Sequence, residues 1–341
     1  MNEYKISYIT GDGIGPELTE ATMEVLKSAQ TKFDIKLKMI EAEAGDTCLE
    51  KTGVALPESS IQKIKESHAC LKGPVGETAA DTIVKLRFIF DLYANLRPIR
   101  TYPANNSNIP EINMIFVREN TEGVYKGQEF SIGLDTTVCL RVITRRNCER
   151  IAKKAFEIAR RRNDKKLVTA IHKANVMRVT DGLFASVCRE TAKQYPDIKF
   201  NELYVDAAAM RLIKEPEKFD VLVTTNMFGD ILSDEAAQLI GGLGMAPGAN
   251  LGDNFALFEP IHGSAPNRAG KQNANPISMI LAAKMMLEWL GEKYNDQNCI
   301  KAGTAIEKGI IKTLQEGPTI PDLGGKTTTF GMAKGIAEAL A

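Results

Sequence analysis

An acidic pair in an apolar segment is the first candidate for chemistry in this sequence. Asp230 and Asp234 are four residues apart, so on a helix their carboxylates project from one face. Two like charges so close repel each other unless a cation lies between them, and Mg²⁺ or Mn²⁺ prefers such oxygen ligands. A solvated acidic face is the alternative, but Phe228, Ile231 and Leu232 make the segment apolar. The spacing therefore favours a metal site.

Four basic residues could act on an anionic substrate. Lys173 ends an apolar strand pattern, where partial desolvation lowers the pKa of a lysine toward that of a useful base. Arg87, Arg97 and Arg118 carry planar guanidinium groups, which bind carboxylates through two hydrogen bonds. A surface lysine and structural arginines are the alternatives, and the sequence alone leaves them open.

Two glycine-containing segments could approach a flat cofactor. Residues 11–17 read GDGIGPE between a strand and a helix, but the third glycine comes one residue early and Pro16 follows it. The dinucleotide fingerprint of a Rossmann fold is therefore absent. Residues 258–271 read FEPIHGSAPNRAGK, where small residues admit a ligand and His262 offers an aromatic face. A tight turn and an irregular loop are the respective alternatives.

Strand and helix patterns alternate along the chain, which predicts an α/β architecture. The absence of an internal repeat and of a low-complexity tract argues against a solenoid or a disordered protein. The predicted strands are 5–10, 35–40, 69–73, 112–118, 167–171 and 221–225, and the predicted helices are 16–32, 57–66, 149–161 and 181–194.

Composition narrows the class of protein. The 341 residues suffice for two domains with a large core, and the formal net charge of zero gives no reason to expect nucleic acid or an anionic membrane as a partner. No apolar run approaches the ~18 residues needed to span a bilayer, and the first residues do not resemble a signal peptide. Six cysteines without a CxxC pair favour free thiols in a reducing cytoplasm.

Two segments resemble crossings between domains. Arg97-Pro98 leaves the first α/β block as an extended segment, and residues 241–248 are rich in glycine. These crossings predict that the first domain is discontinuous, 1–97 plus 243–341, and that a middle domain, 98–242, is inserted into it.

Several long motifs, taken in order, resemble the isocitrate/isopropylmalate dehydrogenases, a family of β-decarboxylating dehydrogenases. The resemblance covers nearly the whole chain. It implies a two-domain α/β fold that is not Rossmann, with the cofactor bound by the discontinuous domain, 1–97 plus 243–341. It also implies that the inserted domain, 98–242, carries the catalytic and metal residues and the interface of a homodimer whose active sites are shared between subunits. The matching segments are 11–17, 92–98 (LYANLRP), 117–125 (VRENTEGVY), 172–175 (HKAN), 204–207 (YVDA), 226–235, 258–271 and 321–325 (PDLGG).

The same resemblance implies roles for individual residues. Tyr125 and Lys173 match the catalytic pair, and Asp206, Asp230 and Asp234 match the metal ligands, Asp206 coming from the partner chain. The substrate residues are Arg87, Arg97, Arg118 and Asn175, with Ile83 and Val84 against the variable group of the substrate. The cofactor residues are Ile14, Glu259, His262, Gly263, Ser264, Ala265, Asn267, Arg268 and Asn275.

The implied reaction is oxidation and then decarboxylation of a 2-hydroxy acid. A metal bound to the 2-hydroxyl and its carboxylate would lower the hydroxyl pKa, and Lys173 would take the proton through water or Asp206. Hydride would pass to a nicotinamide, carbon dioxide would leave, and Tyr125 would protonate the remaining carbon. A non-catalytic regulatory subunit is the alternative outside this class, against which Tyr125, Lys173 and the three aspartates argue.

The helix before Arg87 favours 3-isopropylmalate, the precursor of 4-methyl-2-oxopentanoate in leucine biosynthesis. Isocitrate enzymes carry Ser and Asn six and four residues before that arginine, where this chain has Asp81 and Ile83. Asp81 would repel the third carboxylate of isocitrate, whereas Ile83 and Val84 offer an apolar wall. Isocitrate and homoisocitrate stay as alternatives, and Ala80 stands where isopropylmalate enzymes often carry Glu.

The choice between NAD and NADP depends on a few loop residues. NAD-linked isopropylmalate relatives usually carry Asp where Asn267 stands. Asn267 removes a charge that would repel a 2′-phosphate, and Arg268 could attract one. Pro321 and Gly325 replace the Tyr and Arg with which NADP-linked isocitrate enzymes hold that phosphate. The balance favours NAD, with appreciable use of NADP.

Overall fold

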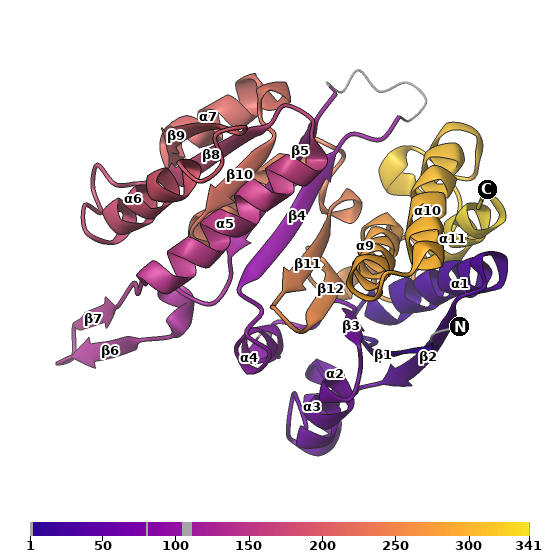
Figure 1. The fold of residues 1–341 in the computed structure, drawn as a ribbon. Helices are drawn as coiled ribbons and strands as arrows, with labels where there is room; N and C mark the ends of the chain where they lie inside the picture. The colour runs from indigo at the N-terminus through magenta and orange to yellow at the C-terminus, as the bar shows by residue number, and fades with distance from the viewer. Residues whose placement is uncertain (1–2, 80, 104–110, 341) are drawn as a thin grey trace.

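The computed structural model describes residues 3–79, 81–103 and 111–340. Within these residues one ten-stranded sheet runs through the molecule in the order β2-β1-β3-β12-β11-β4-β5-β10-β8-β9 (Figure 1). Its strands are β1 Glu3–Ile9, β2 Lys36–Glu41, β3 Ala69–Lys72, β4 Ala94–Arg100, β5 Asn113–Glu119, β8 Leu167–His172, β9 Lys199–Tyr204, β10 Val221–Thr224, β11 Pro247–Leu251 and β12 Ala256–Pro260.

Two parallel blocks of strands meet at an antiparallel centre. The strands β2, β1, β3 and β12 run parallel to one another, as do β5, β10, β8 and β9. Between the blocks, β11 pairs antiparallel with both β12 and β4, and β4 pairs antiparallel with β5. A Rossmann sheet is mostly parallel and has another strand order, so the predicted non-Rossmann α/β fold is confirmed.

The two expected domain crossings lie at this antiparallel centre. Arg97 and Pro98 are consecutive residues of β4, and residues 241–248 lead into β11. Because the sheet continues without a break across β11, β4 and β5, the division into 1–97 plus 243–341 and 98–242 stays a prediction.

Helices cover both faces of the sheet. Contacts place α5 on β5, β8 and β10, and α9 on β3, β11 and β12, whereas α8 packs on β4, β5 and β10. The helices are α1 Gly15–Phe33, α2 Asp46–Thr52, α3 Glu58–Lys65, α4 Asp81–Ile89, α5 Arg145–Arg162, α6 Thr180–Ala192, α7 Val205–Lys214, α8 Asn226–Gln238, α9 Ile277–Tyr294, α10 Gln297–Glu316 and α11 Thr329–Glu338.

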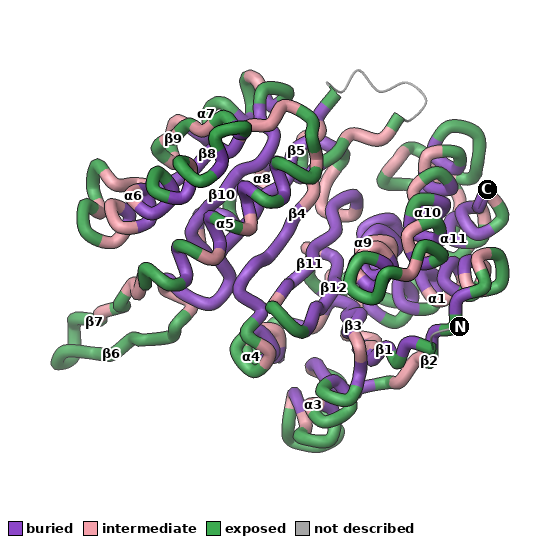
Figure 2. Tube along the Cα trace, in the orientation of Figure 1, coloured by how far each residue is buried: buried purple, intermediate pink, exposed green. Residues whose placement is uncertain are grey.

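Burial follows this layering. The central strands and the inner faces of the helices are buried, and the outer helix faces are exposed (Figure 2). The β6–β7 hairpin, Glu129–Ile132 with Thr136–Cys139, projects away from the sheet, and all of its residues except Val138 are exposed. No helix in the described part of the chain is long and apolar enough to cross a membrane.

Local sequence accounts for where individual helices begin. Pro16 lies in the first turn of α1, where its missing N–H costs no hydrogen bond. The α5 helix begins four residues before the predicted 149, because the Thr144 side chain accepts a hydrogen bond from the Asn147 amide and caps the helix. All six cysteines are free thiols, five of them buried.

Candidate active site

Two arginines of the central strands converge on the acidic pair of α8. One guanidinium nitrogen of Arg97 donates to Ser233 Oγ at 2.8 Å and to Asp234 Oδ1 at 2.9 Å. The other donates to Asp230 Oδ1 at 2.9 Å, and Arg118 donates to the same oxygen at 2.5 Å. As the spacing predicted, the two aspartates lie on one helix face. The arginines that were expected to bind the substrate thus form ion pairs with the carboxylates that were expected to bind the metal.

Close packing of α8 on β5 makes this convergence possible. A Cβ at Gly229 would lie 2.3 Å from Thr224 Oγ1 and 2.7 Å from Arg118 Cγ, so only glycine fits there. The Asn226 carbonyl and side-chain oxygens accept from Arg118 Nε at 2.9 and 3.0 Å, and its side chain also accepts from Nη2 at 2.7 Å. These bonds fix Arg118, whose side chain is fully buried.

The charged side chains of this cluster shift one another's pKa values. Burial alone would raise the pKa of Asp230, but Arg118 and Arg97 outweigh it and hold that pKa below its usual value. Burial raises the pKa of Asp234, against the opposing effect of Arg97. Burial and then its neighbours Arg97 and Arg87 lower the pKa of Arg118 to about 9, so it stays a cation at neutral pH. Of the two aspartates, Asp230 is therefore the one whose anion the arginines stabilise more.

Tyr125 faces the same aspartate from the short helix Val124–Lys126. Its hydroxyl donates to Asp230 Oδ2 at 2.6 Å, and the Arg118 guanidinium lies 5.2 Å from its ring centroid. Burial, and then the hydrogen bond to Asp230, raises the pKa of Tyr125. The phenol is thus protonated at neutral pH, as a proton donor must be.

The third arginine belongs to a buried polar network. Arg87 Nε donates to Asn250 Oδ1 at 3.2 Å, and its Nη2 lies 3.7 Å from Glu259 Oε1. Glu259 also accepts from Lys72 Nζ at 2.9 Å and from Asn250 Nδ2 at 2.8 Å. Asn95 donates to Asn250 Oδ1 at 2.9 Å. In this structure Glu259, expected to contact the cofactor, instead contacts Arg87, which is expected to bind the substrate.

A second cluster lies at the end of β8 and the start of α7. Lys173 Nζ lies 2.8 Å from Asp206 Oδ1, and that contact lowers the pKa of Asp206. Asn175 follows on an exposed turn. In the described part of the chain no three histidine, cysteine or acidic side chains gather closely enough to hold a metal. One chain therefore does not bring Asp206 together with Asp230 and Asp234.

The glycine-rich turn packs against the histidine loop. The Ile14 amide donates to the Ser264 carbonyl at 2.8 Å, and a Cβ at Gly13 would lie 2.1 Å from that oxygen. Asp12 accepts hydrogen bonds from the backbone amides of Asp46 and Thr47, at the start of α2. The turn therefore has a structural role. It also brings Ile14 next to the histidine loop, and both were expected to contact the cofactor.

The other loop residues differ in exposure. His262 is half-buried beside the Gly263 carbonyl, and burial lowers the pKa of its imidazole, so it is neutral at pH 7. Gly263 and Asn267 are exposed, whereas Ala265 is half-buried. Asn275 is buried and accepts a hydrogen bond from the first amide of α9 at 3.0 Å.

Arg268, the candidate partner for a 2′-phosphate, already has an anionic partner. Its two terminal nitrogens donate to the Asp322 carboxylate at 2.8 and 3.1 Å, and one of them also donates to the Asn273 carbonyl. Asp322 lies in the short helix Pro321–Leu323, within one of the motifs quoted above. Sequence reasoning missed this pair.

The α4 helix presents the candidate substrate wall. Ile83 and Val84 precede Arg87 by four and three residues, which places all three on one helix face. Ile83 packs partly against the smaller of two core clusters, and Val84 is half-buried. Asp81 is exposed at the first residue of the helix. Ala80 lies outside the described residues.

Some polar residues of this cluster were not predicted from the sequence, although local patterns could have identified them. Asn95 stands two residues before Arg97, so strand alternation places both on one face of β4. Asn226 and Ser233 belong to the quoted segment 226–235 and share α8 with the aspartates. No local sequence pattern could have identified Asn250, because its contacts depend on β11 lying beside β4.

Comparison with known proteins identifies the family of this chain. The family model described as isocitrate/isopropylmalate dehydrogenase matches residues 5–339. The 3-isopropylmalate dehydrogenase of Methanothermobacter thermautotrophicus is 48% identical, over 100% of this chain and 99% of that protein. The isocitrate/homoisocitrate dehydrogenase of Thermus thermophilus is 44% identical, over 99% and 98%. A crystal structure of isocitrate dehydrogenase from Methylococcus capsulatus has a TM-score of 0.91 at 41% identity, covering 99% of both chains.

These matches span both the arginine cluster and the Lys173–Asp206 pair, and they agree with the predicted fold and motifs. The chain belongs to the isocitrate/isopropylmalate dehydrogenase family.

Proposed function

We propose that this enzyme oxidises and decarboxylates 3-isopropylmalate to 4-methyl-2-oxopentanoate, a step of leucine biosynthesis, in the cytoplasm. The observation that carries the proposal is the convergence of Arg97, Arg118 and Tyr125 on Asp230. Relatives named 3-isopropylmalate dehydrogenase, from Archaeoglobus fulgidus and Saccharolobus solfataricus, support the substrate at 49% and 46% identity. The free thiols support a reducing compartment.

The side chains of this protein would bind and orient the substrate. Arg87, Arg97 and Arg118 would bind its two carboxylates, because guanidinium groups match carboxylates in geometry and charge. Val84 and the exposed part of Ile83 would contact the isopropyl group, whose burial contributes on the order of 1–3 kcal/mol.

Two proton transfers would belong to two different clusters. Lys173, held by Asp206, would take the proton of the 2-hydroxyl, through Asp206 or a water molecule. Tyr125 would donate its phenolic proton to the carbon that loses carbon dioxide, and Asp230 orients that hydroxyl.

Dehydrogenases of this family depend on a divalent metal ion and a nicotinamide cofactor. Asp230 and Asp234 fit a divalent ion in part, since both lie on one face of α8 with side chains 33% and 47% exposed. Mg²⁺ or Mn²⁺ there would supply positive charge that acidifies the hydroxyl. The loop from His262 to Asn275, with Ile14 and Glu259, would hold NAD, and NADP less well; the nicotinamide would accept the hydride.

A homodimer would complete the site. Within the described chain the acidic partners of Arg97 and Arg118 are Asp230 and Asp234 alone, so Asp206, with Lys173, would have to come from a second copy. Exposed apolar side chains support such an interface on the elements that carry these residues. They are Ile231 on α8, Met210 and Ile213 on α7, Val176 and Val179 after Lys173, and Phe130 and Ile132 on β6.

Isocitrate and homoisocitrate are the second candidates, because the Thermus thermophilus relative carries both names at 44% identity. Asp81 argues against both of these substrates. It is the first residue of α4, the helix that also carries Arg87, and its carboxylate would repel a third carboxylate on the substrate.

Steady-state formation of reduced nicotinamide tests the proposal. The enzyme is assayed with 3-isopropylmalate, isocitrate and homoisocitrate, each with NAD and NADP and with Mg²⁺ or Mn²⁺. We expect kcat/KM to be highest for 3-isopropylmalate with NAD. Equal or better use of isocitrate would contradict the substrate, and no turnover of any of the three would favour a regulatory subunit.

A further inference from the structure

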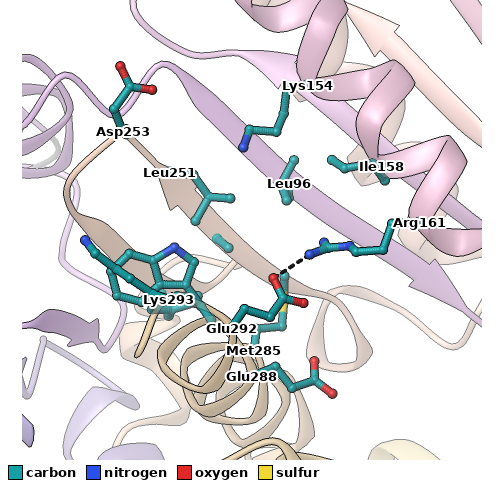
Figure 3. A pocket seen from close by; sticks show the side chains of 14 residues that line it. Leu96, Lys154, Ile158, Arg161, Leu251, Asp253, Met285, Glu288, Glu292 and Lys293 are labelled. Atoms are coloured by element: carbon teal, nitrogen blue, oxygen red, sulfur yellow. Dashed lines mark hydrogen bonds and ion pairs between the residues drawn. The ribbon is translucent and has the colours of Figure 1, made fainter. Parts of the chain in front are cut away.

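A cavity lies on the face of the sheet opposite the arginine cluster. It has a volume of about 410 Å³, and helices α5 and α9 form its two walls (Figure 3). Leu96, Leu251 and Phe258 come from the sheet, whereas Met285 and Trp289 come from α9. We call it the rear pocket. Its volume lies within the range of ligand sites, ~300–1,000 Å³, and such sites often occur where two parts of a fold meet.

Strand alternation joins the rear pocket to the arginine cluster. Along β4, Leu96 lines the pocket, while its neighbours Asn95 and Arg97 contact the buried network and the acidic pair. Along β11, Leu251 lines the pocket and the preceding Asn250 bonds to Arg87. Successive side chains of a strand point to opposite faces, so two strands separate the pocket from the substrate arginines.

Among the described residues, the polar groups at the mouth of the pocket leave one cation without an acidic partner. Arg161 pairs with Glu292 across the pocket, and Glu288 pairs with Lys284 at 3.2 Å. Lys293 donates to the Asn254 carbonyl, and its Nζ lies 4.5 Å from the Trp289 ring centroid. Asp253 interacts with the Tyr93 hydroxyl, which helps raise the pKa of Tyr93 to about 12, after the larger effect of burial.

Lys154 is the exception. It extends from α5 toward the pocket, and no acidic side chain among the described residues forms an ion pair with it (Figure 3). An apolar floor with one unpaired ammonium at its mouth fits an anion that carries a compact apolar body.

We propose that the rear pocket binds a monocarboxylate with a compact aromatic or branched apolar body, and that its occupancy is linked to substrate binding. The carboxylate would pair with Lys154, and the apolar body would pack on Leu96, Leu251 and Trp289. Since the ligand contacts both α5 and α9, it would fix their separation and act on β4 and β11. This site is distinct from the substrate site described above.

The single tryptophan of the chain makes the binding measurable. Trp289 lines the pocket, so its fluorescence reports occupancy without any need for turnover. The intact enzyme is titrated with 3-phenylpropanoate, and separately with 3-phenylpropanamide, which has the same body without the charge. We expect saturable changes with the acid and at least fivefold weaker binding of the amide.

Variants of two neighbouring lysines locate the charge. Lys154→Met should weaken 3-phenylpropanoate binding about fivefold, the size of one partly exposed ion pair. It should leave the amide unaffected. Lys153→Met is the matched control, because Lys153 lies on the same helix, pairs with Glu157 and does not line the pocket. Absence of saturable binding, or equal losses in both variants, would overturn the site.

Linkage is tested on the same protein with 3-isopropylmalate and Mn²⁺. Saturating 3-phenylpropanoate should change the dissociation constant of 3-isopropylmalate at least twofold. Saturating 3-isopropylmalate should change that of 3-phenylpropanoate by the same factor, because coupling between binding sites is reciprocal. The linkage, though not the site, is overturned if 3-isopropylmalate binds equally with and without the acid. If 3-isopropylmalate itself does not bind, the proposed function fails, and isocitrate then replaces it in this measurement.

Discussion

Asn95 and Asn250 lie opposite each other on the antiparallel strands β4 and β11, and the Asn95 amide donates to Asn250 Oδ1 at 2.9 Å. The same Asn250 oxygen accepts from Arg87, and the Asn95 oxygen accepts from Arg97 Nε at 2.7 Å. Two arginines of the proposed substrate site therefore share one buried amide bridge, and a shift of either strand moves both.

Replacing Asn95 with Leu should weaken substrate binding more than it slows turnover. The change leaves Arg97 Nε without an acceptor, which costs about 1–3 kcal/mol of stability. It also frees the guanidinium to rotate, so we expect KM for 3-isopropylmalate to rise about tenfold with a smaller fall in kcat. Asn147→Leu removes a buried side-chain hydrogen bond to Thr121 and serves as control, with a stability loss but unchanged KM. Parallel kinetics of the two variants would show that the bridge is only structural.

Asp230→Asn should preserve the fold and nearly abolish turnover. The amide oxygen can still accept from Arg97 and Arg118, but a neutral amide binds a divalent ion poorly. The concentration of Mn²⁺ needed for half-maximal residual activity should rise at least tenfold. Glu235→Gln, five residues along α8, is the control and should keep wild-type metal dependence. Metal-dependent activity that is unchanged in Asp230→Asn would disprove the metal assignment.

Lys173→Met and Tyr125→Phe should stop the reaction at different steps. Loss of the Lys173 amine removes the base held by Asp206, so no reduced nicotinamide should form in a single turnover. Loss of the Tyr125 hydroxyl spares hydride transfer and slows protonation of the product carbon, by about 10²–10⁴-fold for general acid catalysis. Rapid-mixing absorbance detects the first step and chemical quench the second. The assigned roles are wrong if both variants turn over at the wild-type rate.

The sequence predicted what depends on local patterns. Helical spacing placed Asp230 and Asp234 on one face of α8, where both bind Arg97. The alternation of strands and helices predicted β8 and α1 to within one or two residues at either end, because periodicity and Pro16 are local signals. The failed dinucleotide fingerprint likewise excluded a Rossmann fold.

Contacts between segments that are distant in the sequence could not be predicted from it. The bond between Asn95 and Asn250 joins residues 155 apart in sequence, and it exists only because β11 lies beside β4. No local sequence pattern predicts that β11 is the neighbour of β4. Likewise, the separation of Asp206 from Asp230 reflects how α7 and α8 are placed around the sheet. The proposed metal ligands could be named from the resemblance, but their arrangement within one chain could not.

Acid should destabilise the protein through Glu259. Burial alone would raise the pKa of this carboxyl, but Lys72 and Arg87 lower it to about 2. A carboxyl whose folded-state pKa is depressed contributes stability above its unfolded-state pKa, ~4.3, and that contribution disappears as the pH falls toward 2. The contribution is on the order of 3 kcal/mol.

Chemical denaturation between about pH 5 and pH 2 measures this contribution. Glu259→Gln should be less stable than the wild type at pH 7, since it leaves Lys72 buried without its anion. Its free energy of unfolding should then fall less steeply on acidification. Parallel pH profiles for the two proteins would show that other carboxyl groups dominate acid unfolding.

Asp322 should set the preference for NAD through Arg268. Its carboxylate accepts two hydrogen bonds from that guanidinium, at 2.8 and 3.1 Å, so a 2′-phosphate would have to displace an anion already in place. In Asp322→Asn the guanidinium is free and the repelling charge is gone. We expect the ratio of kcat/KM for NADP to that for NAD to rise about tenfold, or 1.4 kcal/mol. Adding Arg268→Gln should reverse this gain, because the cation that binds the phosphate is then lost. A wild-type preference for NADP above about a hundredfold, roughly 2.7 kcal/mol, would contradict the assignment of NAD itself.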